Sequence, residues 1–528
     1  MTQGEKLLHR LEELNAIGVA LSSERDIDRL LETILVAAKR ITNADAGTLY
    51  LLEPERQLLK FSIMRTDSLG IAQGGTTGNA IKPYPIHLID KDGKPNHSMV
   101  VAHVALNDVT VNIADAYTAE GFDFSGTKGF DKKTGYRSTS FLAVPMKNHE
   151  NEIIGVLQLI NAQDRESGAI VSFSEDDQHL LESLASQAAI ALTNRRLIQQ
   201  LEDLFESLIN LINTAIDDKS PYTGGHCERV PALTMMLAEA ANNTKIGDKD
   251  FILTEKDRYE LKIAGLLHDC GKITTPVHVV DKSTKLETIF DRIQLIDTRF
   301  EILKRDAEIE ALRGLRTNAE FEATVRQLDD DRTFLRRCNI GSEKMQDADI
   351  ARVKQIARYQ WRNTEGRPAD FLSAEEVENL TIRAGTLTAA EREIINHHIN
   401  VTIKMLEALP WPNHLKHVPE YAGGHHERMD GKGYPKGLKR EQMPIQARVM
   451  GIADIFEALT AKDRPYKEGK TLTESLAILG RFKENGHIDP DLFDVFIREK
   501  VYLKYARQFL KPEQIDEVDE SRIPGYAP

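Results

Sequence analysis

The spacing of hydrophobic positions changes from helical to strand-like within the first 195 residues. An amphipathic helix opens this part, with apolar residues at Leu11, Leu14, Ile17 and Leu21. A second apolar helical stripe covers residues 27–41. Strand-like runs follow, at residues 47–52, 58–63, 141–146 and 153–160. The polar stretch 148–151 between the last two runs is typical of a hairpin turn, so the pattern predicts one domain of helices and strands over residues 1–195.

A long helical pattern then runs from about residue 174 to residue 218. Its leucines alternate spacings of four and three, at Leu197, Leu201, Leu204, Leu208 and Leu211. This is the seam of a short coiled coil, which predicts a linking helix over residues 196–218 that pairs in a parallel homodimer. The alternative is that these leucines pack on their own domain.

Residues 219–475 read as a helical domain with an insertion at about 286–385. One helical stripe in the insertion is formed by Ile289, Ile293, Ile296, Phe300 and Leu303. A second surrounds Ile350 and Val353, and the stretches 328–331 and 339–342 read as breaks between helices. We expect a highly charged helical hairpin, which either contacts a partner or serves as a solvated arm. Residues 476–528 are expected to form a C-terminal helical extension and tail.

Histidine and aspartate gather at five places in this helical region: His226, His268-Asp269, His397-His398, His425-His426 and Asp454. The His-Asp pair closes the apolar run 263–267, so both side chains are expected to be buried, which is costly unless they are paired or bind metal. One aspartate can offer an oxygen to each of two cations. Imidazole-rich sites with carboxylates and no thiolate suit Fe, Mn or Zn better than Mg. Two such ions can clamp a phosphodiester and activate water for in-line displacement.

The most specific signal is the run from His425 to Pro435, with sequence HHERMDGKGYP. Gly431 and Gly433 permit unusual backbone angles, and Pro435 fixes the exit of the loop. The alternative for all five places is a set of hydrogen-bonded polar residues in a helical core.

Composition narrows the functional classes. The chain has 528 residues, which favours two or three domains, and its 41% hydrophobic and 28% charged content is that of a globular protein. A net charge of −14 argues against a nucleic-acid polymer as partner, although a local basic cluster can still bind a small anion. No apolar run approaches the roughly 18 residues that span a bilayer, and no signal core opens the chain, so no membrane contact and a cytoplasmic location are expected. The three cysteines form no paired framework.

The first 195 residues resemble a GAF domain, a small-ligand sensor. The resemblance rests on residues 112–117 (NIADAY), 130–138 (FDKKTGYRS), the strand 141–146 and the closing strand 154–161. Ile113 stands where cyclic-nucleotide-binding members have lysine, and Lys132 breaks their acidic pair. The resemblance therefore implies an unknown small ligand other than cAMP or cGMP, or a domain that serves only as a dimerising scaffold.

Residues 200–280 and 385–470 resemble the HD-GYP domain, a branch of the HD phosphohydrolases. The resemblance implies that His268, Asp269 and Lys272 are catalytic, with Asp269 bridging two metals. It implies this set of metal ligands: His226, His268, Asp269, His398, His425, His426 and Asp454. It also implies a substrate-binding set: Lys272, Tyr434, Arg464 and Lys467. Of the pair His397-His398, the spacing to Thr402 favours His398. Some members hold a third metal with a glutamate where this chain has Tyr222, so two divalent ions are expected, Fe or Mn.

The expected fold class is multidomain α+β. It comprises an N-terminal GAF domain with an antiparallel sheet and helices, a linking helix, and an all-α HD-GYP domain that carries a helical insertion. The resemblance implies hydrolysis of cyclic di-GMP to pGpG, and in a second cycle to GMP, under control of the GAF domain. Two alternatives stay open. One is a phosphohydrolase for another cyclic dinucleotide, and the other is a non-catalytic protein that binds cyclic di-GMP or a partner.

Overall fold

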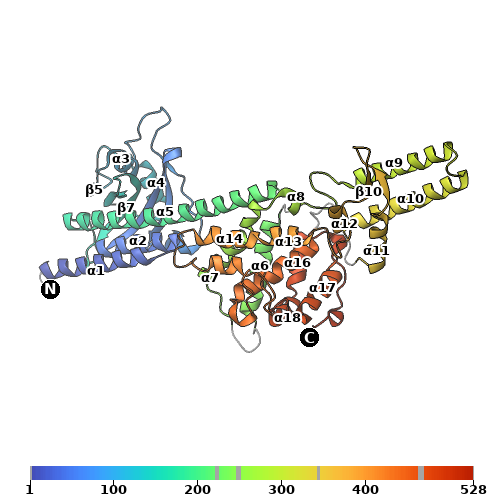
Figure 1. The fold of residues 1–528 in the computed structure, drawn as a ribbon. Helices are drawn as coiled ribbons and strands as arrows, with labels where there is room; N and C mark the ends of the chain where they lie inside the picture. Colours follow the sequence, from blue (N-terminus) through green and yellow to red (C-terminus); the bar gives the residue numbers. More distant parts are fainter. Residues whose placement is uncertain (1–2, 220–224, 245–250, 342–344, 462–468, 527–528) are drawn as a thin grey trace. The chain divides into compact units, whose positions relative to one another are not determined.

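The computed structural model describes residues 3–219, 225–244, 251–341, 345–461 and 469–526 (Figure 1). The chain divides into two compact units, Met1–Leu204 and Phe205–Pro528. Each unit is built around hydrophobic cores of its own.

The first unit is organised by an antiparallel sheet in which β1 and β7 are central. The strands along the sheet follow the order β3-β2-β1-β7-β6-β5. Their bounds are β1 Ala44–Glu53, β2 Leu58–Thr66, β3 Ile71–Gly74, β5 Val111–Ile113, β6 Phe141–Lys147 and β7 Ile153–Gln163. Two short strands lie off this path: β4 (Ile86–His87) pairs with β2, and β8 (Ile170–Val171) pairs with β7. β6 and β7 form the hairpin that the polar stretch 148–151 predicts.

The continuous apolar run of β6 is explained by helices on both faces of the sheet. Successive side chains of a strand point to opposite faces. Leu142 and Val144 accordingly join one core, whereas Phe141 and Ala143 join the other. The first core is closed by α1 (Gln3–Ser23), α2 (Ile27–Thr42) and the first part of α5 (Glu175–Lys219), and the second includes residues of α3 (Val100–Asn107). The short helix α4 (Ser125–Thr134) completes this unit.

Helix α5 is one continuous helix of 45 residues. Its first part buries Leu180, Leu184 and Ala188 in the first unit. Further along, the five leucines of the predicted seam are all exposed, by 45 to 67%. The predicted border between residues 195 and 196 therefore falls inside a helix, and the proposed domain limits stay a prediction.

The second unit is helical around one large core. Helix α6 (His226–Asn243) packs against α7 (Glu255–Leu267), α16 (Ile445–Thr460), α18 (Pro490–Arg498) and α19 (Val501–Phe509). The remaining helices of this core region are α8 Val277–Val280, α13 Ala389–Asn396, α14 His398–Glu407, α15 Val418–Gly423 and α17 Leu472–Glu484. Leu476, Phe493 and Tyr505 are fully buried in the same core as α6, so the C-terminal helices are an integral part of this unit.

The insertion has a separate hydrophobic core. Its elements are α9 Ile293–Leu312, α10 Asn318–Asn339, α11 Asp347–Ile356, β9 Gln360–Arg362, β10 Pro368–Asp370 and α12 Ala374–Leu380. Helices α9 and α10 lie side by side as the predicted hairpin (Figure 1). Phe300, Leu335, Ile356 and Phe371 pack between these elements, so the insertion is a small folded body.

Three details of the predicted insertion are wrong. Residues 328–331, predicted as a break between helices, lie inside α10. The acidic run can stay helical there because the buried Asp331 accepts hydrogen bonds from Arg352 and Tyr359. Ile289 precedes α9 and is 97% exposed, so it is not part of the helical stripe. A two-stranded hairpin, β9–β10, interrupts the helices, and its three-residue strands are too short to show an alternating pattern.

The expected fold class is confirmed: an antiparallel sheet with helices precedes a helical region that carries the insertion. Within the described residues, none of the helices combines the length and the apolar character that crossing a bilayer requires.

The close pairing of β1 and β7 gives a first test. A Cβ at Gly155 would lie 2.2 Å from the carbonyl oxygen of Tyr50, which belongs to the neighbouring strand. Gly155→Ala should therefore destabilise the first unit by about 1–3 kcal/mol. Hydrogen exchange of the β1 and β7 amides should become faster. The matched control is Gly129→Ala in α4, where nothing lies within 4 Å of the added methyl, and unchanged exchange in Gly155→Ala would contradict this account.

Candidate metal centre

The seven predicted metal ligands converge in the second unit. They form two groups whose ligand atoms lie within 4.8 Å of one another: Asp269, His398, His425 and His426, and then His226, His268 and Asp454. His397 is exposed and lies outside both groups, whereas His398 is 3% exposed. The structure thus brings together side chains from α6, the end of α7, α14, the segment after α15, and α16.

The Asp269 carboxylate lies between the two groups. Its Oδ1 is 3.2 Å from His398 Nε2, and its Oδ2 is 3.1 Å from His226 Nε2 and 3.3 Å from His268 Nε2. One oxygen therefore faces each group, which is the arrangement that a carboxylate shared by two cations requires. Asp454 Oδ1 approaches His226 Nε2 to 3.4 Å and completes the second group.

Three of the imidazoles are oriented by the same local hydrogen bond. The Nδ1 atoms of His268, His398 and His425 each donate to the carbonyl oxygen three residues earlier, at Gly265, Ile395 and Ala422. The donor–acceptor distances are 2.7, 2.5 and 2.6 Å. A carbonyl oxygen only accepts, so Nδ1 carries the proton and Nε2 presents its lone pair to the site. Such a partner on the far nitrogen is typical of metal-binding histidines.

His226 is oriented by a different device, which sequence reasoning missed. Its Nδ1 lies 2.6 Å from Oε2 of Glu457, a residue of α16 that is 1% exposed. Arg229 Nε, one turn along α6, donates to the other oxygen of Glu457 at 2.7 Å. Glu457 follows Asp454 by three residues, so both acids lie on one face of α16. A buried acid one turn after a predicted ligand is the signal that could have found it.

The pKa shifts of His425, His426 and Asp269 favour the protonation states that bind a cation. Burial lowers the pKa of His425 to about 4, and burial with the neighbouring His425 lowers the pKa of His426 well below its usual value. Burial alone would raise the pKa of Asp269, but Lys272 and His268 hold it well below its usual range. His425 and His426 are therefore neutral beside an ionised Asp269, which are the forms that ligate metal. At His226, burial alone would lower the pKa, but the hydrogen bonds with Asp269 and Glu457 raise it to about 10.

Several buried atoms of the site have no hydrogen-bond partner among the described residues: His268 Nε2, His425 Nε2 and Asp269 Oδ1. Buried polar atoms are almost always paired, so each such atom needs an explanation. All three point into the centre, and all three are acceptors once Nδ1 carries the proton. A donor set of imidazoles and carboxylates with such acceptors fits divalent ions such as Fe, Mn or Zn.

Close helix packing brings Asp269 next to His398. The turn after Asp269, η3 (Cys270–Thr274), lies directly on α14. The Gly271 amide donates to Thr402 Oγ1 at 2.9 Å, and a Cβ at Gly271 would lie 2.1 Å from the His398 carbonyl oxygen. Glycine at this position therefore permits the approach of the two segments that carry ligands of one group.

The loop from His425 to Pro435 is held by the remaining residues of the motif. The Tyr434 ring stacks on His426, with centroids 4.8 Å apart, and the Tyr434–Pro435 peptide bond is cis. Glu427 is 4% exposed and accepts from the backbone amides of Lys436 and Leu438, at 2.7 and 2.8 Å. These contacts hold the loop in shape, and the predicted substrate-binding role of Tyr434 stays a prediction.

The predicted phosphate-binding residues are only partly visible. Lys272 Nζ donates to Asp269 Oδ2 at 2.5 Å, so it lies at the centre itself. Arg464, Lys467 and Tyr222 fall outside the described residues, so their predicted roles stay predictions.

Comparisons with known protein families agree with this arrangement. The GAF domain family matches residues 26–192, and two HD domain families match residues 223–392 and 374–492. The chain carries a GAF domain and an HD domain. The resemblance inferred from the sequence motifs is confirmed at this level, and the candidate metal centre lies within the residues that the HD domain families match.

Several curated proteins that resemble this chain are phosphodiesterases of bacteria. Over 81 residues the chain is 43% identical to a 3′3′-cGAMP-specific phosphodiesterase of Vibrio cholerae, covering 15% of this chain and 19% of the relative. Over 116 residues it is 35% identical to a cyclic di-GMP phosphodiesterase of Pseudomonas aeruginosa, covering 22% and 27%. The chain thus spans less than a third of the length of these two relatives.

Among solved structures, the chain matches the GAF domain of an Acinetobacter phosphoenolpyruvate-protein phosphotransferase. The match covers 36% of this chain and 98% of that chain, at 18% identity and a TM-score of 0.27.

The contact between Glu457 and His226 generates a prediction on metal affinity. Glu457→Gln should weaken binding of Mn²⁺ to the chelator-treated protein by about 10- to 100-fold, because the amide orients His226 less strongly than a carboxylate. Isothermal titration with Mn²⁺ measures this. Glu420→Gln, an exposed glutamate before the metal-binding loop, is the control and should bind as the unsubstituted chain does. Equal affinities for all three proteins would show that Glu457 does not position His226.

Proposed function

We propose that this chain is a metal-dependent phosphodiesterase that hydrolyses cyclic di-GMP to pGpG and, in a second cycle, to GMP. The observation that carries the proposal is the position of Asp269, with one carboxylate oxygen toward each of two His/Asp groups. The HD domain, together with the similarity of the chain to named phosphodiesterases, supports the reaction class.

The seven residues of the two groups would hold two divalent ions, Fe or Mn, with Asp269 shared between them. The bound ions would supply Lewis-acid polarisation of the phosphodiester and an activated water for in-line attack. The i−3 hydrogen bonds on His268, His398 and His425 keep their Nε2 atoms directed at the centre. Lys272 offers a positive charge beside Asp269 that can neutralise a phosphate oxygen, with Arg464 and Lys467 as further phosphate contacts.

A second candidate substrate is 3′3′-cGAMP, because one of the relatives is named as specific for it. Both substrates carry the same kind of phosphodiester and differ in one base, so the metal centre does not discriminate between them. Turnover of the two dinucleotides, measured side by side on the same preparation, decides which is the substrate. A protein that binds either dinucleotide when loaded with metal, yet hydrolyses neither, would instead be a non-catalytic binding protein.

Regulation belongs to the same proposal. The GAF domain would bind a small ligand and bias catalysis through α5, whose exposed leucines would pair with those of a second copy. In this scheme residues 1–195 form the sensor, 196–218 the linking helix, 219–475 the catalytic domain and 476–528 its C-terminal part.

The adjacent histidines His397 and His398 provide a matched test of the centre. His398→Ala should lower metal content and reduce turnover of cyclic di-GMP by at least about 100-fold, because it removes a buried ligand. His397→Ala removes an exposed side chain and should leave both unchanged. Metal content and turnover are measured on the same samples, prepared with and without oxygen. The metal analysis also identifies which metal is bound. A His398→Ala protein with full activity and full metal content would refute the ligand assignment.

The predicted dimer has a test of its own. Leu204 is 57% exposed on α5, and Leu204→Glu would place a charge in the proposed seam. The variant should shift the chain from dimer to monomer in light scattering. Asn210→Glu, at an exposed polar position of the same helix, should leave the mass unchanged. A monomeric unsubstituted chain, or a dimer that survives Leu204→Glu, would contradict the seam.

A further inference from the structure

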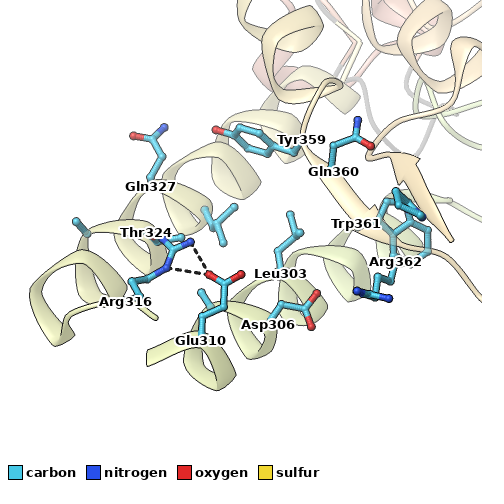
Figure 2. Close-up of a pocket in the computed structure, with 14 residues that line it drawn as sticks. Leu303, Asp306, Glu310, Arg316, Thr324, Gln327, Tyr359, Gln360, Trp361 and Arg362 are labelled. Atoms are coloured by element: carbon cyan, nitrogen blue, oxygen red, sulfur yellow. Dashed lines mark hydrogen bonds and ion pairs between the residues drawn. The ribbon is translucent and has the colours of Figure 1, made fainter. Parts of the chain in front are cut away.

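The insertion contains a cavity of about 710 Å³ (Figure 2). It is formed by α9, α10 and the β9–β10 hairpin, and none of the predicted catalytic or metal-binding residues lines it. A volume of this size falls in the range of sites that bind small molecules.

One part of the cavity wall is apolar and aromatic. Leu303 and Ala307 of α9 and Leu328 of α10 line it together with Tyr359 and Trp361. Both aromatic rings are fixed by contacts behind them. Tyr359 Oη donates to the buried Asp331 at 2.7 Å, and Trp361 Nε1 donates to the Asp370 carbonyl oxygen at 3.2 Å. The aromatic wall is therefore already in place before any ligand binds.

Two carboxylates one helical turn apart face the same space, Asp306 and Glu310. Arg316 Nε and Nη2 both donate to Oε2 of Glu310, at 3.1 and 2.8 Å, which leaves Oε1 without a partner in the described part of the chain. Asp306 is half-buried and makes no hydrogen bond or ion pair with any described residue. Arg316 also donates to Thr324, so its guanidinium is committed away from Asp306.

A carboxylate without a partner beside a fixed aromatic wall is a recognition site for a cation. A carboxylate forms charge-assisted hydrogen bonds with an ammonium group, and indole and phenol faces attract a cation as well as apolar carbon. An anion would meet Asp306 and the free oxygen of Glu310, whereas the nearby Arg362 lies at an exposed position and donates to the Gly366 carbonyl oxygen.

We propose that this cavity binds a small organic ammonium ion with an apolar body, its charged group at Asp306 and its body against Trp361 and Leu303. The insertion would then be a second small-molecule site of the chain, in addition to any ligand of the GAF domain. The proposal does not depend on the proposed phosphodiesterase activity, because no metal ligand takes part.

Three probes that share one ring separate the alternatives: 2-phenylethylamine, the neutral 2-phenylethanol and the anion phenylacetate. Ligand-observed NMR titrations with the full chain should give saturable binding of the amine and at least tenfold weaker binding of the other two. Equal affinity for all three probes would reduce the cavity to a non-specific apolar surface. Preference for phenylacetate, or no saturable binding of the amine, would overturn the proposal.

Variants locate the binding site. Asp306→Asn should weaken binding of 2-phenylethylamine by about tenfold, the effect of losing one charge-assisted contact. Trp361→Leu should weaken binding of both the amine and the alcohol. Glu308→Gln, an exposed acid on the same helix, is the matched control and should bind as the unsubstituted chain does. Asp306 makes no contact that folding needs, so Asp306→Asn should keep the circular dichroism of the unsubstituted chain, and unchanged affinity in that variant would refute the site.

Discussion

The organisation of the HD domain depends on one buried carboxylate. Asp269 is 2% exposed and ionised, and a charge withdrawn from water in this way must be balanced by its surroundings. Lys272 and the imidazoles of His226, His268 and His398 approach it directly. These groups come from segments far apart in the sequence, so the packing of α6, η3 and α14 is what assembles the electrostatic balance around Asp269.

The insertion enters the chain between two of these segments without separating them. The two ends of the insertion are joined by contacts of Lys282. Its ammonium group lies 2.8 Å from the Glu391 carboxylate, near the start of α13, and 2.9 Å from Asn379. Residues before and after the insertion are thus held in contact through the buried Lys282. The insertion has a hydrophobic core of its own, so it can carry a cavity that is separate from the rest of the second unit.

The sequence predicted the parts whose signal is local. The apolar run of β6 and the hairpin after it are visible because each depends on neighbours in the chain. The seven His and Asp positions were named through the resemblance to the HD-GYP domain, and the structure gathers them from segments far apart in the chain. Glu457 was missed because its role arises from α6, more than two hundred residues away in the chain. Residues 328–331 were misread for the same reason, since Asp331 is satisfied by Arg352 and Tyr359 from later segments. The C-terminal helices looked like an extension because nothing in their spacing indicates which core they join.

Because the imidazoles are oriented in two different ways, helix movement would affect their orientation unequally. His268, His398 and His425 are each oriented by a carbonyl oxygen three residues earlier in the chain. Each ring therefore keeps its orientation relative to its own segment when that segment moves. His226 stands at the first turn of α6 and takes its orientation from Glu457 across a helix–helix contact. A small sliding of α6 against α16 would therefore turn one ligand away while three keep their direction. Under the proposed metal binding, the group that contains His226 would be the one through which a change in helix packing alters metal occupancy.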